Sequence, residues 1–118
     1  MSIELKIIAE GTTTNQTEGT IHLRGSVKNN GDKSVAVWPA QLNIRLEDHE
    51  GRPVPIRVEE VEKTEDRTLP PDERWEFALT LRASHIKLGL PYRLTAWWQG
   101  LGEPDTSAFR FRQVDPGP

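Results

Sequence analysis

Two segments in the second half of the chain alternate large apolar residues with polar or small residues at every second position. The first covers residues 75–81 and the second covers residues 92–98. Successive side chains of a strand point to opposite faces, so a period of two predicts strands with one face in a core. We therefore expect two antiparallel strands, and the alternation predicts which of their side chains face inward.

The second segment ends in two adjacent tryptophans, Trp97 and Trp98. If Tyr92 faces the core, the same parity places Trp98 in the core and Trp97 on the outer face, together with Arg93. A single bulge within residues 92–97 would exchange these two roles.

Length and composition indicate one thin domain. The 118 residues leave no room for a second domain, and we expect a single domain over residues 1–115 followed by a tail over residues 116–118. Hydrophobic residues make up 35% of the chain and charged residues 28%, which suits a two-layer sandwich with a polar exterior. The chain has no cysteine, which excludes disulfides and thiolate chemistry.

Turn-forming residues divide the chain into about seven strands at spacings of roughly 8–15 residues, without a long helix. The expected strands lie near residues 3–7, 20–28, 35–46, 54–58, 75–81, 92–98 and 109–111, with one helical turn over residues 83–89. This pattern predicts an all-β fold, an antiparallel sandwich.

Local features refine this expectation. The sequence Asn-Asn-Gly-Asp at residues 29–32 predicts a tight hairpin that makes the strands on either side neighbours. Gly25 faces inward and indicates a close contact or a bulge, and strict alternation requires a kink at Pro39. Pro53 and Pro55 indicate a strand at the edge of a sheet.

Three stretches carry a resemblance to bacterial immunoglobulin-like modules. Residues 25–31 look like a strand-and-turn signature of the form V-x-N-x-G, and residues 69–73 lead into an alternating strand. Residues 89–94 are similar to the corner at which such folds place a tyrosine, here Tyr92, at the start of the sixth strand. The resemblance implies an immunoglobulin-like antiparallel β-sandwich over nearly the whole chain. Adhesion repeats, intracellular proteinase inhibitors and accessory domains share this fold, so the resemblance implies no activity.

Recognisable catalytic and metal-binding motifs are absent from the sequence. His22, His49 and His85 lie on separate segments without metal-type spacing, and the acidic residues 59–66 lack the spacing of a calcium loop. Neither a G-x-S-x-G nucleophile motif nor a glycine-rich phosphate loop occurs. We therefore expect a protein that is not an enzyme and that needs no cofactor or metal.

Charge and hydropathy limit the partners that we expect. The formal net charge of −3 provides no overall attraction for nucleic acid or anionic lipid. The chain shows no signal peptide and no apolar run long enough to cross a membrane, which predicts a cytoplasmic protein with neither nucleic acid nor membrane as partner. A mature fragment of a secreted protein would look the same.

One surface remains as a candidate site. Strand parity predicts that five residues share one outer sheet face: Trp38, Trp97, Arg93, Arg110 and Arg112. Arg45 also lies on this face if the kink at Pro39 leaves its side chain pointing outward. In one interpretation the arginines stack over the indoles as a self-contained cation–π cluster. In the other, the face binds a partner, because Trp and Arg are enriched at interface hot spots.

The sequence thus predicts a non-catalytic protein-protein interaction or assembly module that binds a protein or a second copy of itself. The first alternative is a carbohydrate-binding or proteinase-inhibitor-like accessory domain, since flat indoles also stack on sugar rings. The second is a small ligand-binding protein or an enzyme without a recognisable motif, which would require a large internal cavity.

Overall fold

The computed structural model describes residues 3–14, 17–38, 41–62 and 67–114. These residues form ten strands: β1 (Ile3–Thr13), β2 (Glu18–Asn29), β3 (Val35–Val37), β4 (Asn43–Glu47), β5 (Pro53–Val54), β6 (Ile56–Glu62), β7 (Arg67–Leu69), β8 (Arg74–Ser84), β9 (Pro91–Trp98) and β10 (Leu101–Gln113). The expected tail at 116–118, the kink at Pro39 and the last acidic residues, 63–66, lie outside the described residues. No described helix is long and apolar enough to span a membrane.

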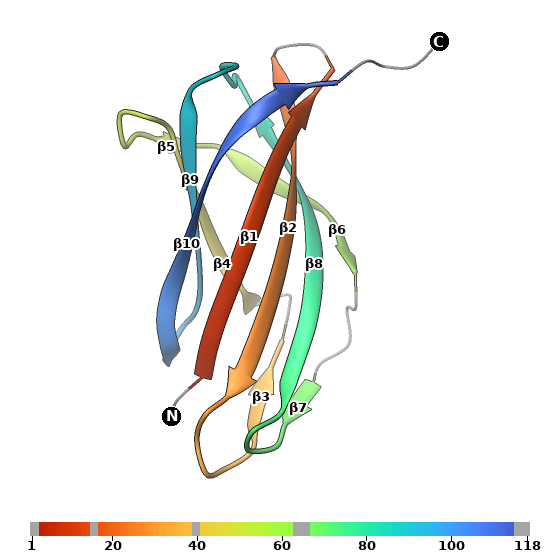
Figure 1. The fold of residues 1–118 in the computed structure, drawn as a ribbon, viewed down its shortest axis with the longest axis vertical. Helices are drawn as coiled ribbons and strands as arrows, with labels where there is room; N and C mark the ends of the chain where they lie inside the picture. Colours follow the sequence, from red (N-terminus) through yellow and green to blue (C-terminus); the bar gives the residue numbers. More distant parts are fainter. Residues whose placement is uncertain (1–2, 15–16, 39–40, 63–66, 115–118) are drawn as a thin grey trace.

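Eight of the described strands form one continuous sheet in the order β5-β4-β9-β10-β1-β2-β8-β6. The sheet curls so that its two halves face each other across a core (Figure 1). One half contains β1, β2, β8 and β6, and the other contains β10, β9, β4 and β5. The expectation of an all-β fold is confirmed.

The two alternating segments are strands, as predicted, but they lie in opposite halves of the sheet. Trp75, Phe77, Leu79 and Leu81 of β8 are buried and alternate with more exposed residues, and β9 shows the same alternation. β8 pairs with β2 and β6, whereas β9 pairs with β10 and β4. Their apolar faces meet across the core, where the rings of Phe77 and Trp98 make an edge contact with centroids 5.5 Å apart.

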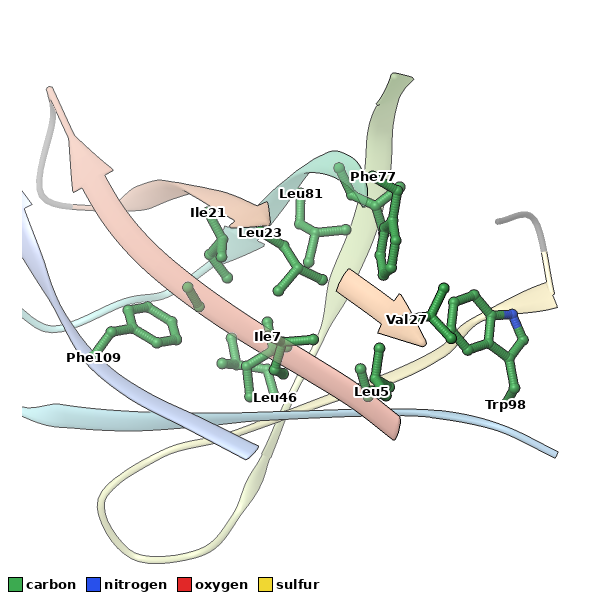
Figure 2. Close-up of a cluster of buried hydrophobic side chains, with 14 of the residues drawn as sticks. Leu5, Ile7, Ile21, Leu23, Val27, Leu46, Phe77, Leu81, Trp98 and Phe109 are labelled. Carbon is green, nitrogen blue, oxygen red and sulfur yellow. The ribbon is translucent and has the colours of Figure 1, made fainter. Parts of the chain in front are cut away.

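Figure 2 shows buried side chains from both halves meeting in this core, among them Leu23, Val27, Phe77, Leu46 and Trp98. The predicted close contact at Gly25 is part of this packing. A Cβ atom at Gly25 would lie 2.2 Å from the Phe77 ring, so the ring fills the space that a side chain on β2 would occupy. Glycine is required here by packing, since its backbone has no unusual dihedral angle.

The hairpin predicted at residues 29–32 is wrong, because β2 pairs with β1 and β8 and not with β3. Asn29 is fully buried and its side chain redirects the chain. Its Oδ1 atom accepts a hydrogen bond from Gly31 N–H (2.9 Å), and its Nδ2 atom donates to the carbonyls of Lys33 (2.7 Å) and Leu69 (2.8 Å). These bonds direct the chain away from the β1–β2–β8 layer, so that β3 pairs with β7 in a separate two-stranded sheet.

The estimate of about seven strands is too low because two expected strands each divide and because β7 was not expected. The expected strand at 35–46 becomes β3 and β4, which belong to different sheets. The expected strand at 54–58 divides at Pro55 into β5 and β6, which lie at the two opposite edges of the large sheet. The predicted edge position of Pro53 and Pro55 is therefore confirmed. The helical turn expected over 83–89 does not form; β8 runs to Ser84 and a turn follows at residues 88–89.

The two halves join at a seam between β1 and β10. These strands pair in parallel only at residues 11–13 with 111–113, and they separate toward the start of β1 (Figure 1). Where they separate, side chains of β10 replace the backbone ladder: Ile7 N–H donates to Asp105 Oδ2 (2.8 Å) and Ala9 N–H donates to Ser107 Oγ (3.0 Å). At the far end, Gly102 approaches the Ile3 carbonyl so closely that a Cβ would lie 2.5 Å from its oxygen.

Candidate interaction surface

The outer face of β4, β9 and β10 carries most of the predicted site. The register places Glu47 and Ala108 on either side of Arg93, and Arg45 and Thr106 on either side of Thr95. Cross-strand neighbours share a face, so Arg45, Arg93 and Trp97 point away from the core with Arg110 and Arg112. We call these five residues the arginine–tryptophan face.

The predicted roles of the two tryptophans are confirmed by their burial. Trp98 is only 3% exposed, whereas Trp97 is partly buried on the outer face. The Trp98 indole N–H donates to the Trp38 carbonyl at 3.0 Å, which satisfies its one polar group inside the core. No bulge interrupts the pairing of β9 with β4 over residues 93–97, so the side chains of β9 keep alternating between the core and the outer face up to the two tryptophans.

Trp38 does not belong to this face. It follows β3, which pairs with β7 in the two-stranded sheet and not with β9. Its backbone contacts the core through the bond from Trp98, and its side chain is 41% exposed. The predicted set of five therefore divides, because parity along one strand says nothing about which sheet that strand joins.

The arginines of the face differ in their partners. Arg45 forms an ion pair with Glu47 (3.3 Å), and the Arg110 guanidinium donates to the Gly89 carbonyl. Arg93 and Arg112 have no hydrogen bond or ion pair with any described residue, and both are exposed. These two guanidinium groups retain their donors for an external acceptor.

The first interpretation, a self-contained stack of arginines over the indoles, has no counterpart among the described residues. The ring contacts found there join core aromatics, such as Tyr92 with Phe109 and Phe111, and none involves Trp97. Thr95 and Thr106 instead share a hydroxyl hydrogen bond (3.1 Å) at the centre of the face. The face is thus a polar, cationic surface with one partly covered indole.

At the β6–β8 edge of the opposite half, one arginine on the outer face is neutralised by two glutamates. Arg82 lies between Glu59 (2.8 Å) and Glu18 (3.1 Å), and Arg57 also contacts Glu59 (3.1 Å). The hydrogen bonds and positive charge of Arg82 lower the pKa of Glu59.

On the β4–β5 turn, which belongs to the same half as the arginine–tryptophan face, the backbone N–H groups of Arg52 and Glu50 lower the pKa of Asp48. Within the described part of the chain, no three His, Asp or Glu side chains converge as metal ligands.

Two surface hollows accompany these elements. One of about 260 Å³ lies between the β4–β5 turn and β9, lined by Asp48, His49, Tyr92 and Arg93 among others. The other, of about 550 Å³, lies on the outer face of β1, β2 and β8, and includes Ile8, Arg24 and Ala78. Ile8 did not emerge from the sequence patterns as a site residue, although an isoleucine at an outward position of a strand was a readable signal.

Comparison with known proteins gives no family for this chain. No protein-family model matches the sequence, and no curated protein matches it significantly. A solved structure of an uncharacterised β-sandwich protein from Clostridium difficile 630 is similar, with a TM-score of 0.43 and 13% sequence identity. That match covers 92% of this chain and 80% of the other.

Proposed function

We propose that this protein is a non-catalytic binding module that uses the arginine–tryptophan face to hold an acidic protein surface. The observation that carries the proposal is a pair of exposed guanidinium groups, Arg93 and Arg112, which have no partner among the described residues and lie on the same sheet face as the partly buried Trp97. Trp and Arg are the side chains most enriched at interface hot spots.

The charge of the face supports an acidic partner. The outward residues of β9 within this face, Arg93, Thr95 and Trp97, include no acid, and the Glu47 carboxylate on β4 is already paired with Arg45. A guanidinium binds a carboxylate through two parallel hydrogen bonds, so free arginines favour Asp and Glu side chains on the partner. The proposal excludes nucleic acid as the main partner because the chain carries a net charge of −3.

We also propose that the fold is immunoglobulin-like. The strand order supports this. If the strands of an immunoglobulin-like fold are lettered A to G along the chain, β1-β2-β8-β6 corresponds to its sheet A-B-E-D, and β10-β9-β4 corresponds to its sheet G-F-C with β5 added at the edge. The tyrosine corner supports it as well. Tyr92 lies at the start of β9, and its hydroxyl accepts a hydrogen bond from the Lys87 N–H at 2.8 Å.

The proposal is tested by cross-linking the protein in native extract and identifying bound proteins by mass spectrometry. We expect Trp97→Ala and the Arg93→Glu/Arg112→Glu double variant to lose the same acidic partner. The matched controls are Trp38→Ala, an exposed indole outside the face, and Arg52→Glu, an exposed arginine on the β4–β5 turn. Both controls should retain the partner.

A partner that survives Trp97→Ala and the double arginine variant would overturn the proposal. A glycan array separates the carbohydrate alternative: sugar binding that is lost with Trp97→Ala would replace a protein partner with a saccharide. Salt provides a further check, because a charge-based complex weakens as ionic strength rises.

A further inference from the structure

The hollow on the outer face of β1, β2 and β8 has a floor of small residues and a single apolar side chain at its rim. Gly25, Ser26 and Ala78 form the floor, and the Phe77 ring closes it from the core side. Ile8 lines the hollow and is 65% exposed, the highest exposure among the large apolar side chains described. The face thus carries both a projecting apolar side chain, Ile8, and a hollow of about 550 Å³ that could receive such a side chain from another molecule.

Opposite charges face each other across this hollow. The register aligns Lys6, Ser26 and Glu76 in one row across β1, β2 and β8, and Ile8, Arg24 and Ala78 in the next row. A third row contains Glu4, Lys28 and Arg74. In each row the residue on β1 is therefore complementary to the residue on β8, in charge or in size.

We propose that this hollow is a two-fold interface between two copies of the chain. A two-fold axis along β2 lays β1 of one copy over β8 of the other, as in face-to-face packing of sheets. Ile8 then enters the hollow above Ala78 of the second copy. In the same arrangement Lys6 meets Glu76 and Glu4 meets Arg74, and each contact occurs twice. Within one copy Lys6 and Glu4 form an ion pair with each other (3.2 Å), so the new contacts share or replace that pair.

The size of the surface indicates a weak, reversible dimer. Three strands about nine residues long cover roughly 14 Å by 30 Å at standard strand spacings, or about 400 Å² on each copy. The two copies together thus bury about 800 Å², which is below the roughly 1,200 Å² at which specific, stable interfaces begin. The two Arg24 side chains approach each other near the axis, as do the two Lys28 side chains, and these like charges oppose association.

The sharpest test uses opposite charge reversals at Lys6 and Glu76, followed by analytical ultracentrifugation from about 1 μM to about 1 mM. Lys6→Glu sets Glu against Glu76 at both contacts, and Glu76→Lys sets Lys against Lys6. We expect each variant alone to raise the dimer dissociation constant at least about tenfold. A mixture of the two variants should restore association as a heterodimer, because both contacts then regain opposite charges.

Three further variants complete the test. Ile8→Glu should abolish the dimer, whereas Val58→Glu, at an exposed valine on β6, should leave it intact. Arg24→Gln should strengthen it by removing the repulsion at the axis. Circular dichroism spectra and melting temperatures check that each variant is folded.

A native chain that remains monomeric up to about 1 mM would overturn the inference. So would a dimer that survives Ile8→Glu, or variants that fail to restore association when mixed. A dimer lost with Trp97→Ala but kept with Ile8→Glu would place self-association on the arginine–tryptophan face instead. The inference and the proposed function therefore fail separately.

Discussion

The two halves of the curled sheet share one core but differ in how the charged side chains on their outer faces are paired. On the β1–β2–β8–β6 half, β1 pairs with β2 without interruption from Ile3 to Thr12, the register of β6 on β8 shifts between Val58 and Glu60, and Arg82 is neutralised by Glu59 and Glu18. On the β10–β9–β4–β5 half, β10 begins with a bulge, and Arg93 and Arg112 face outward without a described partner. The difference teaches that the same architecture builds an ion-pair network around Arg82 at the β6–β8 edge and leaves Arg93 and Arg112 of the other half without a described partner.

The aromatic packing between the halves allows the largest test of this comparison. Trp98→Ala removes an indole that contacts Phe77 across the core and donates to the Trp38 carbonyl, which keeps only its bond from the Gln41 N–H. We expect a loss of about 3–5 kcal/mol in the free energy of unfolding, measured by urea denaturation. A loss below about 1 kcal/mol would contradict the assignment of Trp98 to the core.

The next effect concerns the seam that joins the halves. Asp105→Ala removes the acceptor of the Ile7 N–H, and a buried donor left unpaired costs about 1–3 kcal/mol. Asp105→Asn is the matched control, because its amide oxygen can still accept this bond and should retain most of the stability. Hydrogen exchange at the Ile7 amide should quicken in the Ala variant and much less in the Asn variant. Equal losses in both would show that the carboxylate charge, and not the acceptor, closes the seam.

Overpacking within the β1–β2–β8 half should give an effect of similar or smaller size. Gly25→Ala places a methyl group 2.2 Å from the Phe77 ring, which costs about 1–3 kcal/mol as the ring is displaced. Combining it with Phe77→Leu should give less than the sum of the two single losses, because the smaller side chain leaves room. Additive losses in thermal unfolding would show that the two sites do not compete for the same space.

Removing the outer indole of the other half should barely change stability. We expect Trp97→Ala to shift the free energy of unfolding by less than about 1 kcal/mol, since this side chain lies on the outer face. Paired measurements of Trp97→Ala and Trp98→Ala therefore separate surface from core within two adjacent residues. A large loss of unfolding free energy in Trp97→Ala would show that Trp97, and not only Trp98, belongs to the core.

The smallest effect is the acid response of the contact between Arg82 and Glu59. The pKa of Glu59 is lowered from its ordinary value of 4.5 by Arg82, so this contact stabilises the fold above pH 4.5. The stabilisation is lost as the pH falls through the folded-state pKa, which lies below 4.5. The difference in melting temperature between the native chain and Arg82→Met should therefore be present at neutral pH and vanish in strong acid. A difference that persists in strong acid would point to lost packing of the arginine stem.

Sequence patterns predicted the local part of this structure well. Alternation placed Trp98 inside and Trp97 outside, an inward glycine indicated the contact at Gly25, and paired prolines indicated an edge. Each of these depends on neighbouring residues of one strand. The misplacement of Trp38 and the wrong hairpin after Asn29 have the opposite origin, because both depend on which distant strand a segment joins.

The seam and the hollow were beyond sequence reasoning for the same reason. Asp105 reads as a loop acid in the sequence, yet it bonds to Ile7 across a separation of 98 residues. Ile8 reads as an isolated apolar residue, and only the register of β1, β2 and β8 places it beside Arg24 and a floor of small side chains. Neither the bond between Asp105 and Ile7 nor the position of Ile8 beside the hollow can be inferred from the neighbouring residues in the sequence.

The sequence by itself determined the all-β character of this protein and the side of the strand on which each tryptophan of the doublet lies. Side-chain direction alternates by backbone geometry, so it can be read within a single strand. The tertiary structure alone decided that β8 and β9 face each other across the core, that side chains of β10 close the seam, and that Arg93 and Trp97 share a face from which Trp38 is absent. Those features depend on how strands far apart in the chain pair as the whole sheet closes, and no local pattern encodes that choice.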